Sequence, residues 1–229
     1  MKRLSTTLAI LLVAAFAASP MLVQAQMGAP KEKSEVAKLI EAAMASNIRS
    51  ADERARDAKE RKPVETLEFF GLQPNMTVVE LMPSGGWYTK ILAPVLAEKG
   101  KLIVAVGGAR LAPKLLEWKL DKVEAQDGKF EFRPSGQYGV GEIDAMESPI
   151  TGADMVLTFR NMHNFTPAAR AKINATVFGM LKPGGIFGVV DHTRRHMEPG
   201  AVENWRRIDP VVVIQEASAA GFEFVGFSD

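Results

Sequence analysis

Two short polar clusters each follow an apolar run that resembles a β-strand. The first is Arg160-Asn161-Met162-His163-Asn164, and the second is Asp191-His192. An imidazole can accept a proton from a substrate N–H or O–H near neutral pH, so His163 is a candidate general base. We expect Arg160, Asn164 and His192 to face the same acceptor molecule. The alternative is that His163 and Asn164 only satisfy backbone groups of a turn.

A third stretch, Val78 to Thr89, reads as a strand, a glycine turn and the start of a helix. Glycines let a ligand approach the backbone, and the N–H groups at a helix start favour an anionic group. The alternative is a tight turn without a ligand, in which the two aromatic residues serve as packing anchors. The candidate ligand-binding residues are Glu80, Pro83, Ser84, Gly85, Gly86, Trp87, Tyr88 and Thr89.

A metal site is a weaker hypothesis. His192 and His196 are four residues apart, but two imidazoles at that spacing form a metal pair only on a helix. The intervening sequence and Pro199-Gly200 indicate a loop instead. We therefore expect no metal, and a metal-dependent hydrolase that uses His163, His192 and His196 is the third functional possibility.

The N-terminus has the pattern of a cleaved secretory signal. Lys2 and Arg3 precede an uncharged apolar run over residues 8–18, and small residues at 23–25 suit a signal peptidase. Pro20 interrupts this run, and a membrane span needs about 20 apolar residues. We expect residues 1–25 to be removed and the mature protein to be periplasmic or secreted, without a stable membrane anchor.

The 229-residue chain carries 28 Lys and Arg against 27 Asp and Glu, and it has no cysteine. This balance favours neither nucleic acid nor an acidic membrane surface, so a small-molecule substrate is the expected partner. The sequence also lacks the glycine motifs of nicotinamide and nucleoside-triphosphate sites, and it lacks the G-x-S-x-G turn of serine hydrolases.

Helices, and then alternating strands and helices, are expected to position these residues. Residues 34–71 read as helices only. Short apolar strands that alternate with helices imply a parallel sheet covered on both faces, with the ligand beyond the carboxyl ends of the strands. The expected strands are Thr77–Leu81, Lys101–Val106, Lys129–Arg133, Met155–Phe159, Ile186–Val190 and Phe222–Phe227.

The helix expected over residues 50–61 is very polar. Ser50 and Glu53 form a capping box, and the pairs Asp52–Arg56 and Asp57–Arg61 have the spacing of ion pairs on a helix. We expect this helix to present a solvated face. The alternative is a lid that contacts the ligand.

Several motifs together carry a resemblance to a known family. The runs L-K-P-G-G-I-F-G-V-V (Leu181–Val190) and A-A-G-F-E-F-V-G (Ala219–Gly226) resemble class I S-adenosylmethionine-dependent methyltransferases. More narrowly, P-S-G-G-W-Y-T, F-R-N-M-H-N-F and V-D-H resemble a family of exported, methyltransferase-like bacterial proteins. The similarity begins near Arg49, so the expected organisation is a signal peptide (1–25), an N-terminal tail and helix (26–48), and a methyltransferase-like domain (49–229).

This resemblance implies an α/β, Rossmann-like, doubly wound and mostly parallel sheet with additional N-terminal helices. It also implies S-adenosylmethionine as cofactor and methyl transfer to an unknown acceptor in the cell envelope. The alternative is a non-catalytic, methyltransferase-like binding protein of the periplasm. In the family, the residues directly after the fourth parallel strand face the transferred methyl group, which here are Arg160 to Asn164.

The chain departs from the family at three places. The positions of the family's alternate glycines are Met82, Ser84 and Gly86 here, and no carboxylate follows the second strand to accept ribose hydroxyls. Asp144 resembles the acidic residue near the adenine ring, or is an ordinary loop acid. The family's seventh, antiparallel strand has no counterpart before Asp229, and the sixth strand would then have an unpaired edge.

Overall fold

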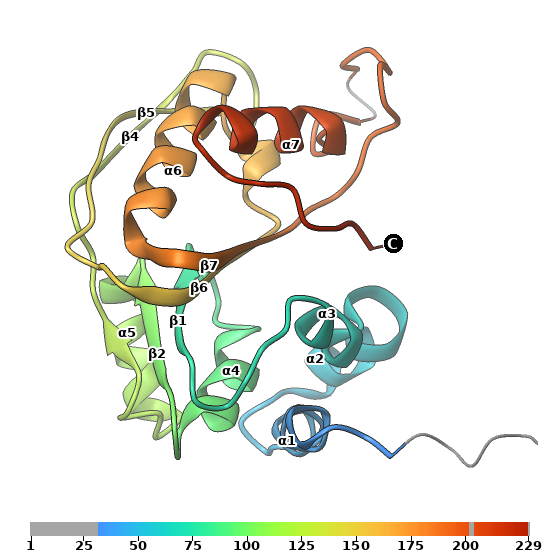
Figure 1. Ribbon diagram of the computed structural model, residues 1–229, viewed down its shortest axis with the longest axis vertical. Coiled ribbons are helices and arrows are strands. Elements are labelled where there is room, and N and C mark those ends of the chain that lie inside the picture. Colours follow the sequence, from blue (N-terminus) through green and yellow to red (C-terminus); the bar gives the residue numbers. More distant parts are fainter. Residues whose placement is uncertain (1–31, 202–203, 229) are drawn as a thin grey trace, which may run out of the picture. The chain divides into compact units, whose positions relative to one another are not determined.

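Five parallel strands form the central sheet of the protein. In the computed structural model they lie in the order β3-β2-β1-β6-β7, and each neighbouring pair is parallel. Helices cover both faces of this sheet (Figure 1). The strands are β1 (Thr77–Leu81), β2 (Lys101–Ala105), β3 (Glu124–Ala125), β6 (Ala153–Phe159) and β7 (Leu181–Val190). The predicted Rossmann-like, mostly parallel α/β fold is confirmed.

The structure describes residues 32–201 and 204–228, and the fold belongs to the unit that begins at Lys33. The predicted signal peptide, residues 1–25, lies outside the described residues. In the described part of the chain, none of the helices is long and apolar enough to cross a membrane. The helical segments are α1 (Glu35–Met44), α2 (Ala51–Arg56), η1 (Asp57–Arg61), α3 (Pro63–Phe69), α4 (Thr89–Leu96), α5 (Gly108–Glu117), η2 (Met162–Asn164), α6 (Pro167–Met180) and α7 (Pro210–Ala219).

Alternate residues of the strands face two separate apolar clusters. On β1, Val79 packs in the cluster that includes Ile173 of α6, whereas Val78 packs in the cluster that includes Ile40 of α1 and Leu92 of α4. Successive side chains of a strand point to opposite faces, so the sheet has a core on each side. Burial of each such side chain contributes roughly 1.5–3 kcal/mol. The carboxyl ends of β1, β2, β6 and β7 are therefore held in place by packed cores on both faces of the sheet.

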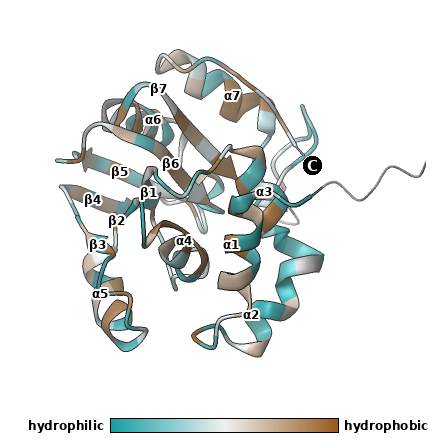
Figure 2. Cartoon of the chain, turned by 60° about the horizontal axis from the view of Figure 1, so that its bottom comes forward, coloured by the Kyte–Doolittle hydropathy of each residue, from teal (hydrophilic) through white to brown (hydrophobic). Residues whose placement is uncertain are grey.

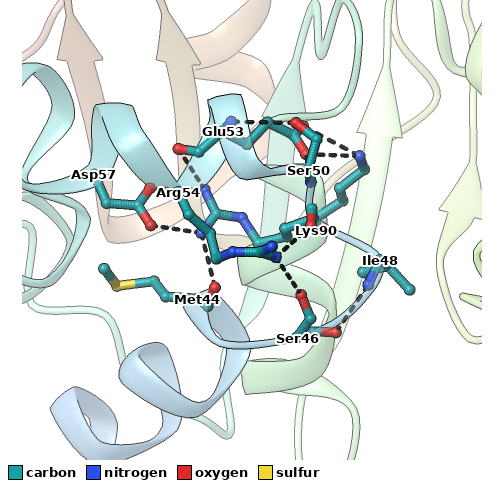
Figure 3. Close-up of polar contacts among 9 residues, drawn as sticks. Met44, Ser46, Ile48, Ser50, Glu53, Arg54, Asp57 and Lys90 are labelled. Atoms are coloured by element: carbon teal, nitrogen blue, oxygen red, sulfur yellow. Dashed lines mark hydrogen bonds and ion pairs between the residues drawn. The ribbon is translucent and has the colours of Figure 1, made fainter.

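The polar helix has the predicted solvated face, since Asp52, Arg54, Arg56, Lys59 and Glu60 are exposed. Its other side is held by ion pairs. The Asp57 carboxylate accepts two hydrogen bonds of 2.7 Å from the Arg49 guanidinium, and the side chain of Arg49 is fully buried. Glu53 binds Lys90 of α4 at 3.1 Å with both oxygens, as Figure 3 shows. The expected pairing of Asp57 with Arg61 is wrong because Asp57 turns inward to Arg49. The predicted capping box of Ser50 and Glu53 is confirmed.

The predicted third strand of the parallel sheet is wrong. Residues near Lys129–Arg133 do form a strand, β4 (Phe130–Pro134), but it pairs antiparallel with β5 (Gly141–Met146) in a separate two-stranded sheet. The two-residue strand β3 takes the edge position beside β2 instead. The glycine-rich passage between β4 and β5 is the turn of this hairpin, and β5 packs against α6.

The C-terminal part also differs from expectation. Strand β7 begins at Leu181 rather than Ile186, and its register shifts between the pairs Ala153–Leu181 and Met155–Ile186. The predicted last strand, Phe222–Phe227, is not formed. Within the described residues, β7 is therefore an edge strand of the sheet. Figure 2 shows hydrophobic residues on α7 next to this edge.

Candidate functional site

Three strands of the central sheet end in a residue with left-handed backbone. Met82 follows β1 with φ 56°, Val106 follows β2 with φ 58°, and Arg160 follows β6 with φ 63°. Such φ values are disfavoured for residues other than glycine, most of all for a β-branched residue such as Val106. Strained backbone concentrates at binding and catalytic sites. The carboxyl edge of the sheet is therefore the candidate site, as the sequence predicted.

The crest of the glycine turn is open. Ser84 and Gly85 are exposed, whereas Pro83 and Gly86 are buried. A Cβ at Gly85 would meet nothing within 4 Å, but a Cβ at Gly86 would lie 2.8 Å from the Trp118 ring. Gly86 is thus needed for packing, and Gly85 leaves backbone free for a ligand to approach.

Glu80 and Thr89 lie beneath this crest. The Thr89 hydroxyl donates a hydrogen bond to the Glu80 carboxyl group, and the two residues are only 2% and 0% exposed. Burial raises the pKa of Glu80 to about 8, against the partial opposing effect of the Thr89 hydrogen bonds. This hydrogen bond joins β1 to α4 beneath the turn. That Glu80 and Thr89 contact a ligand stays a prediction.

The raised pKa of Glu80 predicts a pH-dependent stability. Between the ordinary glutamate pKa of 4.5 and about 8, the native state keeps a proton that the unfolded state releases. The free energy of unfolding should therefore fall as pH rises through this window, by up to about 1.4 kcal/mol per pH unit. Denaturant unfolding at several pH values measures the slope. Glu80→Gln should remove this component, whereas Glu117→Gln, on an exposed part of α5, should keep it.

The two aromatic residues after the turn pack inside the protein. The Tyr88 ring stacks on Phe159 with centroids 3.5 Å apart, and only 3% of Tyr88 is exposed. Burial raises the pKa of Tyr88 to about 12. The Trp87 ring lies between the guanidinium groups of Arg49 and Arg61, at 4.7 and 4.3 Å from its centroid. These contacts support the packing role that the sequence left open for Trp87 and Tyr88.

The cluster after β6 contacts the glycine turn directly. The Asn161 amide nitrogen donates to Thr158 Oγ1 at 2.9 Å and to the carbonyls of Leu81 and Met82 at 3.4 Å. Asn161 thus joins the ends of two neighbouring strands, a role that its place inside the R-N-M-H-N motif did not reveal. The structure brings the glycine turn and the His163 cluster together.

His163 and Asp191 form a buried dyad. The Asp191 carboxylate is bonded to His163 Nδ1 and also accepts the backbone N–H groups of His163 and His192, at 3.1 and 2.7 Å. A carboxylate cannot donate, so Nδ1 carries the proton and Nε2 presents a lone pair. His163 Nε2 is enclosed and has no hydrogen-bond partner among the described residues. This arrangement prepares His163 to accept a proton.

His192 has the opposite tautomer. Its Nε2 accepts a hydrogen bond of 2.7 Å from Arg160 Nε, so the proton of the neutral ring is on Nδ1. Burial, and next the Arg160 guanidinium, lower the pKa of His192. The His163 and His192 rings are 5.7 Å apart. Arg160, His163 and His192 therefore lie together at the strand ends, and of the two Nε2 atoms only that of His163 has no hydrogen-bond partner among the described residues. That these residues face an acceptor stays a prediction.

The other predicted residues lie at different places. Asn164 donates from its side chain to the Arg160 carbonyl at 3.4 Å and so belongs to the cluster. Asp144 is exposed on β5, where it pairs with Arg133 of β4 at 3.0 Å. His196 pairs with Asp209 at 2.9 Å, away from the other two imidazoles. Among the residues that the structure describes, no group of three His, Cys, Asp or Glu side chains could hold a metal ion.

Sequence reasoning missed Asp127 as a candidate ligand-binding residue. Its carboxylate accepts the N–H groups of Gly107, Gly108 and Ala109 at 2.9–3.0 Å, at the start of α5. Asp127 and Phe130 also line a hollow of about 310 Å³ at the end of β2. Two carboxylate oxygens offer about four lone-pair positions, so a further donor can bind. Asp127 thus supplies the carboxylate that the sequence directly after β2 lacks.

Two arginines near the cluster have no carboxylate partner within the described ranges. Arg61 lies over the Trp87 and Tyr88 rings. Arg160 is the next residue in the sequence after Phe159, whose ring stacks on Tyr88. Burial lowers the pKa of Arg61, and the positive charge of Arg160 lowers it further. Two neighbouring, partly buried cations make an electrostatic site for an anion.

Comparisons with known proteins agree with this geometry. The chain is 28% identical over 125 residues to an uncharacterized methyltransferase of Synechocystis sp. (strain ATCC 27184 / PCC 6803 / Kazusa), over 55% of this chain and 51% of that protein. The chain thus matches about half the length of this relative. No protein-family model matches.

Solved structures extend the comparison to the fold. An S-adenosylmethionine-dependent methyltransferase from Aquifex aeolicus matches with a TM-score of 0.53 and 18% identity, over 75% of this chain and 87% of that one. Human N-acetylserotonin methyltransferase in complex with S-adenosylmethionine matches with a TM-score of 0.53 and 14% identity, over 85% and 53%. The fold is that of class I S-adenosylmethionine-dependent methyltransferases. The [4+2]-cyclase SpnF also shares it, with a TM-score of 0.54 and 16% identity over 83% and 71%, so this methyltransferase fold also occurs in a protein named for a different reaction.

The methyltransferase fold explains the strained turn after β1. Met82, Ser84 and Gly86 occupy the positions of the alternate glycines in the family that the chain resembles. All three have positive φ, of 56°, 51° and 77°. At Met82 and Ser84 the chain therefore has backbone conformations that favour glycine, although neither residue is a glycine. Each such non-glycine residue costs on the order of 1 kcal/mol, which the packing beneath the turn has to offset.

Proposed function

We propose that the protein transfers a methyl group from S-adenosylmethionine to a small acceptor. The observation that carries this proposal is the His163–Asp191 dyad, whose unpartnered Nε2 lies at the same strand ends as the open glycine turn. The methyltransferase fold places a ligand at this edge of the sheet.

The residues at this edge fit S-adenosylmethionine. The open crest at Ser84 and Gly85 admits a ligand close to the backbone. Asp127 can accept a ribose hydroxyl beside the hollow at the end of β2. Arg61 and Arg160 provide positive charge for the carboxylate of the amino-acid part. When bound, S-adenosylmethionine supplies an electrophilic methyl group on a sulfonium, which becomes the neutral thioether S-adenosylhomocysteine.

His163 is proposed to accept the proton of the acceptor. S-Adenosylmethionine would supply the methyl group to the acceptor atom, and the N–H or O–H proton of that atom moves to His163 Nε2. Asp191 fixes the ring and stabilises the imidazolium that forms. Because Nε2 is enclosed, the acceptor reaches it through a local opening of the strand-end loops, as in other sites that close over their substrate.

The compartment is part of the proposal. The charged N-terminus and the apolar run that follows support export, and an exported enzyme would meet its acceptor in the cell envelope. The competing proposal is a non-catalytic, methyltransferase-like binding protein of the periplasm. Its support is the enclosed state of His163 Nε2 and the loss of two glycines from the turn.

Binding of the cofactor is tested with Gly85. Gly85→Leu should weaken binding of S-adenosylhomocysteine at least about tenfold, because a side chain there occupies space that a ligand needs, whereas its Cβ has no protein atom within 4 Å. Calorimetric titration measures the affinity. Gly179→Leu is the matched control, because Gly179 on α6 also has nothing within 4 Å. Wild-type protein that binds neither S-adenosylmethionine nor S-adenosylhomocysteine would contradict the proposed function.

A further inference from the structure

A second hollow lies at the turn of the β4–β5 hairpin, and the mechanism above does not use it. Its volume is about 580 Å³, which falls within the range of about 300–1,000 Å³ that is usual for small-molecule sites. One end reaches Asn164, the residue after His163. The hollow therefore borders the residues after β6 through Asn164 and does not include the glycine turn.

The walls of this hollow are largely apolar. Phe132, Pro134, Tyr138 and Val140 line it, and Asn164 is one of its few polar side chains. Among the described residues that line it, none is charged. A charged ligand would lose its hydration there without a partner of opposite charge. The lining thus favours a neutral molecule.

Two glycines set the positions of aromatic rings around the hollow. A Cβ at Gly141 would lie 1.9 Å from the Phe132 ring, and a Cβ at Gly139 would lie 2.0 Å from the Trp205 ring. The Tyr138 and Trp205 rings are 5.1 Å apart. Phe132 and Tyr138 nevertheless remain 55% and 82% exposed. Rings that are held in place but left open to solvent suit a partner ring that stacks on them.

We propose that this hollow binds the acceptor, and that the acceptor is a flat, neutral, mostly apolar ring with a hydroxyl or amine that points toward Asn164 and His163. This inference rests on the proposed function, since it names the substrate class of the same site. The ring packs against the exposed hairpin aromatics, and its polar substituent lies at the side of the hollow that Asn164 lines.

The test uses 2-naphthol as the probe and the full chain. Calorimetric titration should give a dissociation constant below about 1 mM, and Tyr138→Ser should weaken binding about tenfold because a stacking ring is lost. Leu116→Ser is the matched control, because Leu116 is an apolar side chain of α5 that is 73% exposed. It should leave the affinity unchanged. Phe132→Leu, which keeps an apolar contact for the Phe165 ring, should weaken binding in the same direction as Tyr138→Ser.

Two results would overturn this inference. One is equal affinity of 2-naphthol for the wild type and for Tyr138→Ser, and the other is equal affinity of the wild type for 2-naphthol and for cyclohexanol, which has no flat ring. Titration with S-adenosylhomocysteine separates the two proposals. If naphthol binds through Tyr138 but S-adenosylhomocysteine does not bind, methyl transfer is wrong and the ring site remains. If only S-adenosylhomocysteine binds, the ring site is wrong.

Discussion

His163→Ala should lower methyl transfer by about 10²–10⁴-fold, the usual contribution of a positioned general base. The variant removes the buried imidazole nitrogen that has no hydrogen-bond partner among the described residues, and His192 cannot replace it because its Nε2 already accepts from Arg160. The assay follows release of S-adenosylhomocysteine in the presence of 2-naphthol. Affinity for S-adenosylhomocysteine itself should change little, because His163 belongs to the acceptor side.

The control for His163 is His196→Ala. Both imidazoles bind a carboxylate through Nδ1, but His196 pairs with Asp209 and its side chain is 56% exposed. Turnover of His196→Ala should equal that of the wild type. A second reading of His163 is purely structural, since Asp191 holds the loops after β6 and β7 together. If His163→Ala keeps its turnover and loses only stability, the dyad joins these loops and takes no part in proton transfer.

Much of the fold follows from the spacing of apolar residues. Short apolar runs such as Thr77–Leu81 and Met155–Phe159 are buried on both faces, and such runs separated by helices indicate a parallel sheet. The strand after residue 129 was placed wrongly because its partner is decided by tertiary contacts. Phe132 and Arg133 pair with the hairpin strand β5, and no local pattern distinguishes a hairpin strand from a sheet strand.

The position of the candidate site could also be predicted from the sequence, but its hydrogen bonds could not. Arg160, His163, Asn164 and His192 all follow strands, and the carboxyl ends of parallel strands meet at one edge. The tautomers were not predictable, because they depend on Asp191 and Arg160 as hydrogen-bond partners. Asp127 was missed because it lies 21 residues after Val106 in the sequence. It contacts the start of α5 only in the folded protein.

The same limit applies to the polar helix over residues 50–61. Charged residues at helical spacing usually lie in solvent, so the sequence favoured ion pairs between helical neighbours. The structure instead includes a π-helical turn, η1, in which the Lys62 N–H bonds to the Asp57 carbonyl at 2.7 Å. Asp57 thereby faces Arg49, eight residues earlier. A buried ion pair across that separation leaves no signal in a local pattern.

Asp57→Ala should lower the free energy of unfolding by about 3–5 kcal/mol, because it leaves the Arg49 guanidinium buried without its counter-ion. Arg49 keeps only neutral acceptors, namely the Met44 carbonyl at 3.1 Å and the Glu53 carbonyl at 3.5 Å. Denaturant unfolding measures the loss. Asp52→Ala is the matched control, since Asp52 lies exposed on the same helix and should change stability by less than about 0.5 kcal/mol.

The Arg49–Asp57 pair should also affect ligand binding through Trp87. Arg49 lies 4.7 Å from the centroid of the Trp87 ring, and Trp87 directly follows the glycine turn, so loss of the pair loosens the turn from below. Asp57→Ala should therefore bind S-adenosylhomocysteine more weakly than Asp52→Ala under conditions in which both variants remain folded. The double variant Arg49→Met with Asp57→Leu replaces both charges by apolar groups and should regain stability relative to Asp57→Ala. Equal stability of Asp57→Ala and the wild type would show that solvent reaches Arg49 and that the pair does not hold the N-terminal helices on the turn.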